Sequence, residues 1–241
     1  MTRFPIWGLE WRLGLRRRRL FVLNVTIPLL LVVPLIAAGA PAFHSAAAIT
    51  VLFVLFGIFG SAIPLLRDGE GGILRRFVLT GGSEGGILTQ RLLASACLDF
   101  LQLLPSLAVV LLAGEGSIWP LAAAILFPSL LAANLIGAWV AAGARSLAEG
   151  ALFAAVTGLF LLHGSGVFRT ATPGTAGALL ETWLPFGPLH RTLLAATGGG
   201  PPPAEPLVAI MLPLSSGAVL LLVTGLFARF LIERIAPAIR P

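Results

Sequence analysis

Six long apolar runs divide the chain, and short polar or glycine-rich stretches separate them. The runs lie at about 20–40, 47–66, 92–113, 120–142, 150–167 and 207–228. A helix needs about 20 consecutive, mostly apolar residues to cross the hydrocarbon core of a bilayer. The pattern therefore predicts an all-α integral membrane protein, in which residues 1–241 form a single transmembrane domain with six spanning helices.

Charged residues are few and unevenly placed. They make up 11% of the 241 residues, whereas an ordinary soluble domain has about a quarter, so a soluble globular protein is excluded. All sixteen basic residues are Arg, and only Arg169 and Arg191 fall outside if the predicted loops alternate sides. Cytoplasmic loops are the ones enriched in Arg and Lys. We therefore expect a multi-pass protein of the plasma or bacterial inner membrane, with both termini in the cytoplasm.

The composition also limits the chemistry. A chain without Lys lacks the phosphate-binding Lys of a Walker A loop. The single Cys97 and three scattered His residues offer neither a disulfide nor a Cys/His metal cluster. We expect no catalytic residue, metal or cofactor on this chain, and no nucleic acid among its partners.

Residues 4–19 precede the first apolar run and have their own pattern. Trp7 and Trp11 recur at helical spacing, and Arg12 and Arg16 fall on another face. A helix of this kind lies in the membrane interface, with Trp toward the acyl chains and Arg toward the headgroups. A cleaved signal peptide is rejected because the following apolar run is too long for one. Lipid anchoring and protein docking both remain open as its role.

The polar stretch 67–91 reads RDGEGGILRRFVLTGGSEGGILTQR. Ile73, Leu74, Phe77 and Val78 fall on one face of a helix, and a Gly pair follows at residues 81–82. Glycine commonly ends a helix. The pattern predicts a short amphipathic helix within a long loop on the cytoplasmic side.

The same stretch carries a resemblance to a known family. It is similar to the loop after the second span in the membrane subunit of ATP-binding-cassette (ABC) exporters of the type-2 permease family. That loop reads approximately Glu-x-Gly-Thr-Leu-x-Arg-Leu-x-x-Thr-Pro-x-Ser. Residues that match are Glu70, Gly72, Leu74, Arg76, Thr80 and Ser83, and those that differ are Ile73, Phe77 and Gly81. The interfacial helix, the six spans and a long segment before the last span also fit the family.

The resemblance implies that residues 67–91 couple the chain to a separate ABC ATPase. Glu70, Arg75 and Arg76 would make charge-assisted hydrogen bonds to that ATPase, and Leu74 and Phe77 would fill a groove on it. Expected partners are two ATPase copies that bind ATP and Mg, a second permease protomer (homo- or heterodimer), and membrane lipids. An alternative is that Arg75 and Arg76 only hold the loop on the cytoplasmic side.

The segment 168–206 contains two apolar stretches, Ala176–Trp183 and Pro188–Ala196, each too short to span a bilayer. In the resembled family this region forms short re-entrant helices before the last span, and we expect the same here. Backbone that lies at membrane depth without spanning the bilayer must be buried in protein or line a cavity. An ordinary outer loop with an interfacial helix is the alternative.

Four residues with carboxyl or amide side chains fall inside predicted spans: Asn24, Asp99, Gln102 and Asn134. Ionisable and polar groups in a bilayer are costly, so they are candidates for lining a transport pathway. Hydrogen bonds between packed helices are the commoner use of such residues. For Asp99 we favour an interhelical hydrogen bond or the lining of an inner cavity.

The leading hypothesis is the permease subunit of an ABC exporter that moves a hydrophobic or amphiphilic solute, with ATP hydrolysis on another polypeptide. A haem-exporter-like subunit of the same superfamily is an alternative, because Asp68, Gly72 and Leu74 fit its loop spacing. Two other classes stay open. Asp99 could serve an ion-coupled secondary transporter, and the sequence His163-Gly-Ser165-Gly resembles part of an intramembrane protease site.

Overall fold

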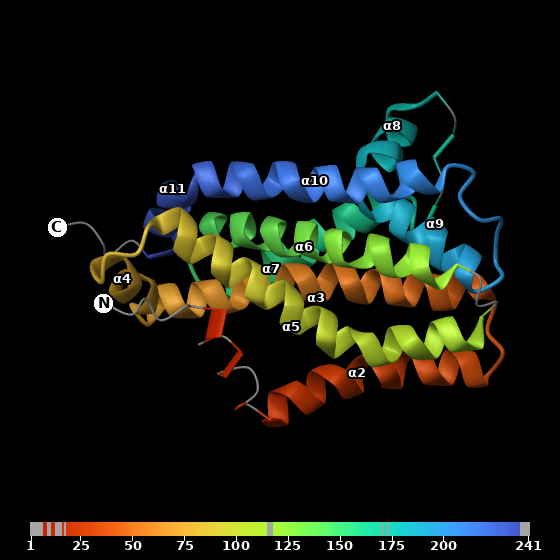
Figure 1. Cartoon of the computed structure of the whole chain (residues 1–241), viewed down its shortest axis with the longest axis horizontal. Helices are drawn as coiled ribbons and strands as arrows, with labels where there is room; N and C mark the ends of the chain where they lie inside the picture. Colours follow the sequence, from red (N-terminus) through yellow and green to blue (C-terminus); the bar gives the residue numbers. More distant parts are fainter. Residues whose placement is uncertain are drawn as a thin grey trace.

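The computed structural model describes residues 7–8, 11–12, 16, 18–114, 118–169, 171–172 and 174–236. The part described is an elongated bundle of helices without strands (Figure 1). Its six long helices are α2 (Arg18–Ala37), α3 (Ala42–Glu70), α5 (Glu84–Ala113), α6 (Trp119–Gly143), α7 (Leu147–Gly164) and α10 (Pro206–Leu226). Its short helices are α4 (Ile73–Leu79), α8 (Ala176–Trp183), α9 (Phe186–Ala196) and α11 (Ala228–Ile235).

The six long helices are each long and apolar enough to cross a membrane, which confirms the predicted number of candidate spans. Their bounds differ from the apolar runs, most clearly in α3 and α5. Helix α3 continues to Glu70, past the apolar run at 47–66, and helix α5 begins at Glu84, before the apolar run at 92–113. Hydropathy marks the part of a helix that lies in lipid, whereas helical hydrogen bonding continues until a residue such as Gly72, with φ +68°, redirects the backbone.

Helices α3 and α6 pack closely at the centre of the bundle. A Cβ added to Gly57 would lie 2.5 Å from the Cβ of Ala133, and one added to Gly137 would lie 2.4 Å from the carbonyl oxygen of Ile58. Small residues let helix backbones approach in this way, which is the usual basis of packing between membrane helices. The α3–α6 pair is therefore the core on which the other helices assemble.

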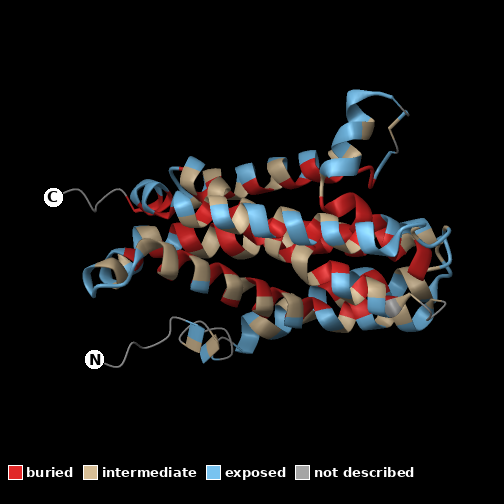
Figure 2. Cartoon of the chain, turned by 45° about the horizontal axis from the view of Figure 1, so that its top comes forward, coloured by how far each residue is buried: buried red, intermediate tan, exposed pale blue. Residues whose placement is uncertain are grey.

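Helices α2, α7 and α10 lie around this core and leave many of their apolar side chains exposed (Figure 2). In α2 only Pro28 and Val32 are buried. Exposed apolar faces of this kind suit contact with lipid or with another membrane protein. The inner and outer helices thus have different surroundings, although all are apolar.

The two ends of the bundle differ in charge. Helices α4 and α11 lie at one end, the α4 end, and α8 and α9 at the opposite end, the α9 end (Figure 1). Arg75 and Arg76 lie on α4, Arg229 and Arg234 on α11, and Arg191 on α9. This asymmetry fits the predicted topology. The assignment of the α4 end to the cytoplasm stays a prediction.

The predicted interfacial helix 4–19 lies largely outside the described residues. Trp7 and Trp11 are described, with ring centroids 6.5 Å apart, and Arg12 and Arg16 are exposed. These positions agree with helical spacing. Whether residues 4–19 form one helix in the interface remains a prediction.

Candidate functional site

The stretch 67–91 is a compact helical unit. Only residues 71–72 and 80–83 lie outside helices, because α3 ends at Glu70, α4 spans Ile73–Leu79 and α5 begins at Glu84. The unit consists of two helix ends joined through a third helix, and we call it the coupling segment after its predicted role. The sequence analysis described it as a loop, and that description is corrected here.

Local hydrogen bonds explain where α4 begins and ends. Gly72 precedes α4 in the left-handed region, and Gly81 follows it with φ +85°. The backbone N–H of Gly82 donates to the carbonyl of Phe77 at 3.4 Å, which satisfies a free carbonyl at the helix end. The hydroxyl of Ser83 then accepts from the N–H of Gly86 at 3.3 Å and caps α5. The predicted short helix stopped by a Gly pair is confirmed.

A buried ion pair joins the two helix ends that carry α4. Asp68 on α3 and Arg91 on α5 form this pair, and both side chains are buried. The sequence analysis used Asp68 only for its spacing and counted Arg91 only among the Arg residues predicted to be cytoplasmic, so it missed their pairing. The sequence did contain a signal for this pair, because the two opposite charges flank the segment at the ends of two apolar runs.

The prediction that Leu74 fills a groove on a partner is wrong. Leu74 is fully buried within the chain, in the same apolar cluster as Leu65, Leu88 and Leu92. Its side chain therefore anchors α4 to the body of the protein. An apolar helix face requires burial, but its periodicity does not say whether the covering surface belongs to the same chain.

The remaining predicted coupling residues are accessible. Glu70, Arg75, Arg76, Thr80 and Ser83 are exposed, and Phe77 and Gly72 are half-buried. In the part of the chain that the structure describes, no ion pair involves Glu70, Arg75 or Arg76.

The sequence analysis also missed Leu79 at the end of α4, which is 72% exposed. Together with Ile73 it adds apolar area beside the two Arg residues. The outer face of α4 therefore offers both charge and apolar surface.

Helix α11, which the sequence analysis did not predict, supports this unit from the side. Its buried residues include Leu231, Ile232 and Ile235. A Cβ added to Gly69 on α3 would lie 2.2 Å from the carbonyl oxygen of Ile235. Arg229 and Glu233 face outward and form an ion pair at 3.0 Å. The last described helix is thus packed against the helix end that precedes α4.

Polar side chains meet in the interior where α3, α5 and α6 cross. The amide nitrogen of Asn134 donates to Oδ2 of Asp99 at 3.2 Å, and the hydroxyl of Ser61 donates to Oδ1 of Asn134. A Cβ added to Gly60 would lie 2.3 Å from Asp99 Oδ2. The carboxyl group is therefore held between an amide on α6 and the backbone of α3.

A second interior contact attaches the outer helix α2. Nδ2 of Asn24 donates to Oε1 of Gln102 at 3.0 Å. Two turns earlier on α5, the hydroxyl of Ser95 donates to the carbonyl of Gly60 at 3.0 Å. Helix α5 thus bonds to α2, α3 and α6 through side chains on successive turns. All four predicted polar residues make hydrogen bonds between helices, and a pathway-lining role for them stays a prediction.

The α9 end contains the two short helices that the sequence predicted for residues 168–206. Helix α9 is largely buried against α3 and α6, and Nδ1 of its His190 lies 3.3 Å from the hydroxyl of Thr50. Helix α8 has no buried residue and projects from the bundle (Figure 2). Two short helices are therefore confirmed, and their re-entrant character stays a prediction.

The His163-Gly-Ser165-Gly sequence does not assemble a nucleophile with a base. The hydroxyl of Ser165 is buried without a hydrogen-bond partner, and the ring of His163 is exposed. Among the residues described, no group of three or more His, Cys, Asp or Glu could hold a metal ion.

Comparison of the chain with protein-family models, curated proteins and solved structures found no match. The fold and site define a class on their own terms. Six helices able to span a membrane indicate a multi-pass membrane protein. This architecture, with hydrogen bonds between polar side chains of its inner helices, is consistent with a transporter-like protein.

Proposed function

We propose that this chain is the membrane-spanning subunit of an ATP-driven exporter of the ABC class. It is energised by a separate ATPase that docks on the coupling segment. The observation that carries the proposal is the two-sided character of α4. Leu74 anchors the helix on one side, and Arg75, Arg76 and Leu79 are presented on the other. The spacing of Glu70, Gly72, Arg76 and Ser83 supports the same proposal through its family resemblance.

The coupling segment suits the transmission of a displacement. A force on α4 passes to α3 and α5 through short connections at residues 71–72 and 80–83. The ion pair between Asp68 and Arg91 holds these two helices together at their bases. Because both helices continue unbroken into the membrane region, movement of α4 moves them as a pair rather than bending a flexible loop.

Helix α5 then carries the displacement to the interior. Its polar face is bonded to α2 through Gln102 and to α6 through Asp99. A shift of α5 therefore acts on several helices at once. We propose that this rearrangement alternates access for a hydrophobic or amphiphilic solute, moved outward from the cytoplasm or inner leaflet.

The assembly we propose contains a second permease protomer and two ATPase subunits that hold ATP and Mg. The exposed apolar faces of α2, α7 and α10 provide the surface for lipid and for the second protomer. The α4 end faces the cytoplasm of a plasma or inner membrane, because most Arg residues of the sequence fall there under the predicted topology.

The experiment uses the full chain, co-expressed with an ABC ATPase encoded beside it. The test variant is Arg75→Glu/Arg76→Glu, and the control is Arg145→Glu, an exposed Arg that precedes α7. We expect the double variant to lose co-purification of the ATPase and the rise in ATP hydrolysis caused by the permease. The control retains both. Equal assembly and hydrolysis in the wild type and the double variant would contradict the proposal.

A second candidate function rests on Asp99, a carboxyl group buried in the interior and bonded to Asn134. In this alternative the chain is an ion-coupled secondary transporter. Purified protein in liposomes, without any ATPase, would then move solute down a proton gradient, and Asp99→Asn would abolish that movement.

A further inference from the structure

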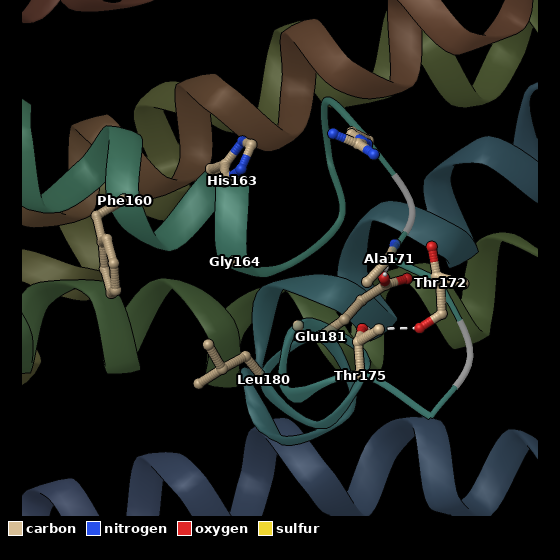
Figure 3. Close-up of a pocket in the computed structure, with 10 residues that line it drawn as sticks. Phe160, His163, Gly164, Ala171, Thr172, Thr175, Leu180 and Glu181 are labelled. Atoms are coloured by element: carbon tan, nitrogen blue, oxygen red, sulfur yellow. Dashed lines mark hydrogen bonds between the residues drawn. The ribbon is translucent and has the colours of Figure 1, made fainter.

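A pocket of about 340 Å³ lies at the α9 end, between the end of α7 and helix α8. Figure 3 shows Phe160 and His163 on the α7 side, and Leu180 and Glu181 on the α8 side. Ligand pockets run from about 300 to 1,000 Å³. This volume therefore suits the headgroup of an amphiphile better than a whole lipid.

The apolar side of the pocket continues the outward face of α7. Phe153, Val156 and Phe160 are all exposed and recur at helical spacing along that face. In a bilayer such a face contacts acyl chains. Leu180 of α8 also lines the pocket and is exposed. An acyl chain lying along α7 would thus lead directly into the pocket.

The polar side of the pocket is cationic. Arg169 lines it and is exposed, and within the described residues it forms no ion pair. Among the described residues of the lining, Glu181 is the only acidic one, and its carboxylate already has partners. Its Oε1 lies 3.5 Å from Nη1 of Arg191, and its Oε2 accepts from the N–H of Ala171 at 3.0 Å. An anion at Arg169 therefore meets a carboxylate whose charge Arg191 partly offsets.

We propose that this pocket binds an amphiphile with an anionic headgroup from the outer leaflet. Arg169 and His163 hold the headgroup, and the first part of the chain lies between Phe160 and Leu180. The rest of the chain follows the outward face of α7. This binding site does not depend on the proposed coupling to an ATPase, so either proposal can fail without the other.

The test is a titration of the purified full chain with phosphatidylglycerol, followed by native mass spectrometry. Phosphatidylcholine is titrated in parallel, and inorganic phosphate is added as a competitor. The variants are Arg169→Gln, Arg169→Lys and Phe160→Ala. Their matched controls are Arg145→Gln, just before α7, and Phe230→Ala, which changes an exposed Phe on α11 at the α4 end, away from the pocket.

We expect phosphatidylglycerol to bind more tightly than phosphatidylcholine and to resist displacement by phosphate. Arg169→Gln should weaken binding about fivefold, the usual effect of one basic residue at an anionic lipid surface, and Arg169→Lys should restore it. Phe160→Ala should weaken binding while both controls leave it unchanged. Equal affinity for the two lipids, displacement by phosphate, or unchanged binding by Arg169→Gln would overturn the proposal. Arg169 is exposed, so Arg169→Gln should fold as the wild type does. The comparison of Arg169→Gln with the wild type therefore tests the proposal even if Phe160→Ala folds poorly.

Discussion

Asp68 and Arg91 form a buried ion pair that closes the base of the coupling segment. The two residues lie on different long helices, one at the end of α3 and one near the start of α5. A buried pair contributes less to stability than its attraction suggests, because both charges lose hydration. Its position indicates a structural role, which is to hold α3 and α5 in a fixed position relative to each other on either side of α4.

Replacing one member of this pair should lower the free energy of unfolding. Asp68→Asn removes one carboxylate partner of the buried Arg91 guanidinium, and breaking a buried ion pair typically costs about 3–5 kcal/mol. We expect a clear fall in Tm for the purified protein. The double variant Asp68→Leu/Arg91→Met should recover much of the loss, because no charge then remains buried. An unchanged Tm for Asp68→Asn would show that the pair does not hold the segment together.

Leu74 and Leu79 lie on opposite sides of α4 and should respond differently to truncation. Leu74→Ala removes a fully buried side chain, and such changes cost about 2–5 kcal/mol. Leu79→Ala changes an exposed residue, so the Tm should stay close to that of the wild type while ATPase binding weakens. Thermal unfolding and co-purification measure the two effects separately. The assignment of the two faces would be wrong if Leu79→Ala lowered the Tm as much as Leu74→Ala.

The close packing of α3 and α6 predicts the effect of one added methyl group. Gly137→Ala places a Cβ 2.4 Å from a backbone oxygen of Ile58, and overpacking of this kind costs about 1–3 kcal/mol. Gly225→Ala is the matched control, since nothing lies within 4 Å of its added Cβ. In a helix that change should be neutral or stabilising by up to about 1 kcal/mol. Equal Tm values for the two variants would contradict the packing.

His190 predicts a dependence of stability on pH. Burial lowers the pKa of His190 from its ordinary value of 6.5, because the charged ring loses hydration. Protons then bind the unfolded chain more readily than the folded one, so stability is lost as the pH falls below about 6.5. His190→Gln should flatten the fall in Tm between pH 7 and pH 5. An identical pH profile for His190→Gln and the wild type would contradict this origin.

The sequence predicted the fold class well because a bilayer imposes a strong length and hydropathy requirement on each span. It also located α4 and α8, where glycine and polar residues interrupt the apolar runs. It failed on the direction in which Leu74 points, on the pairing of Asp68 with Arg91, and on helix α11. Each of these depends on which helices come together in space. Hydropathy along one chain does not contain that information.

The central claim is that α4 is where a separate ATPase docks, and site-specific crosslinking tests it most directly. A chain with Cys97→Ser as background would carry Leu79→Cys on α4 or, as control, Leu112→Cys near the other end of α5. The two leucines are 72% and 86% exposed. With a photoactivatable label on the new thiol, the account predicts an adduct with the ATPase from position 79 alone. The absence of that adduct in an assembled, active complex, or an equal yield from position 112, would contradict the account.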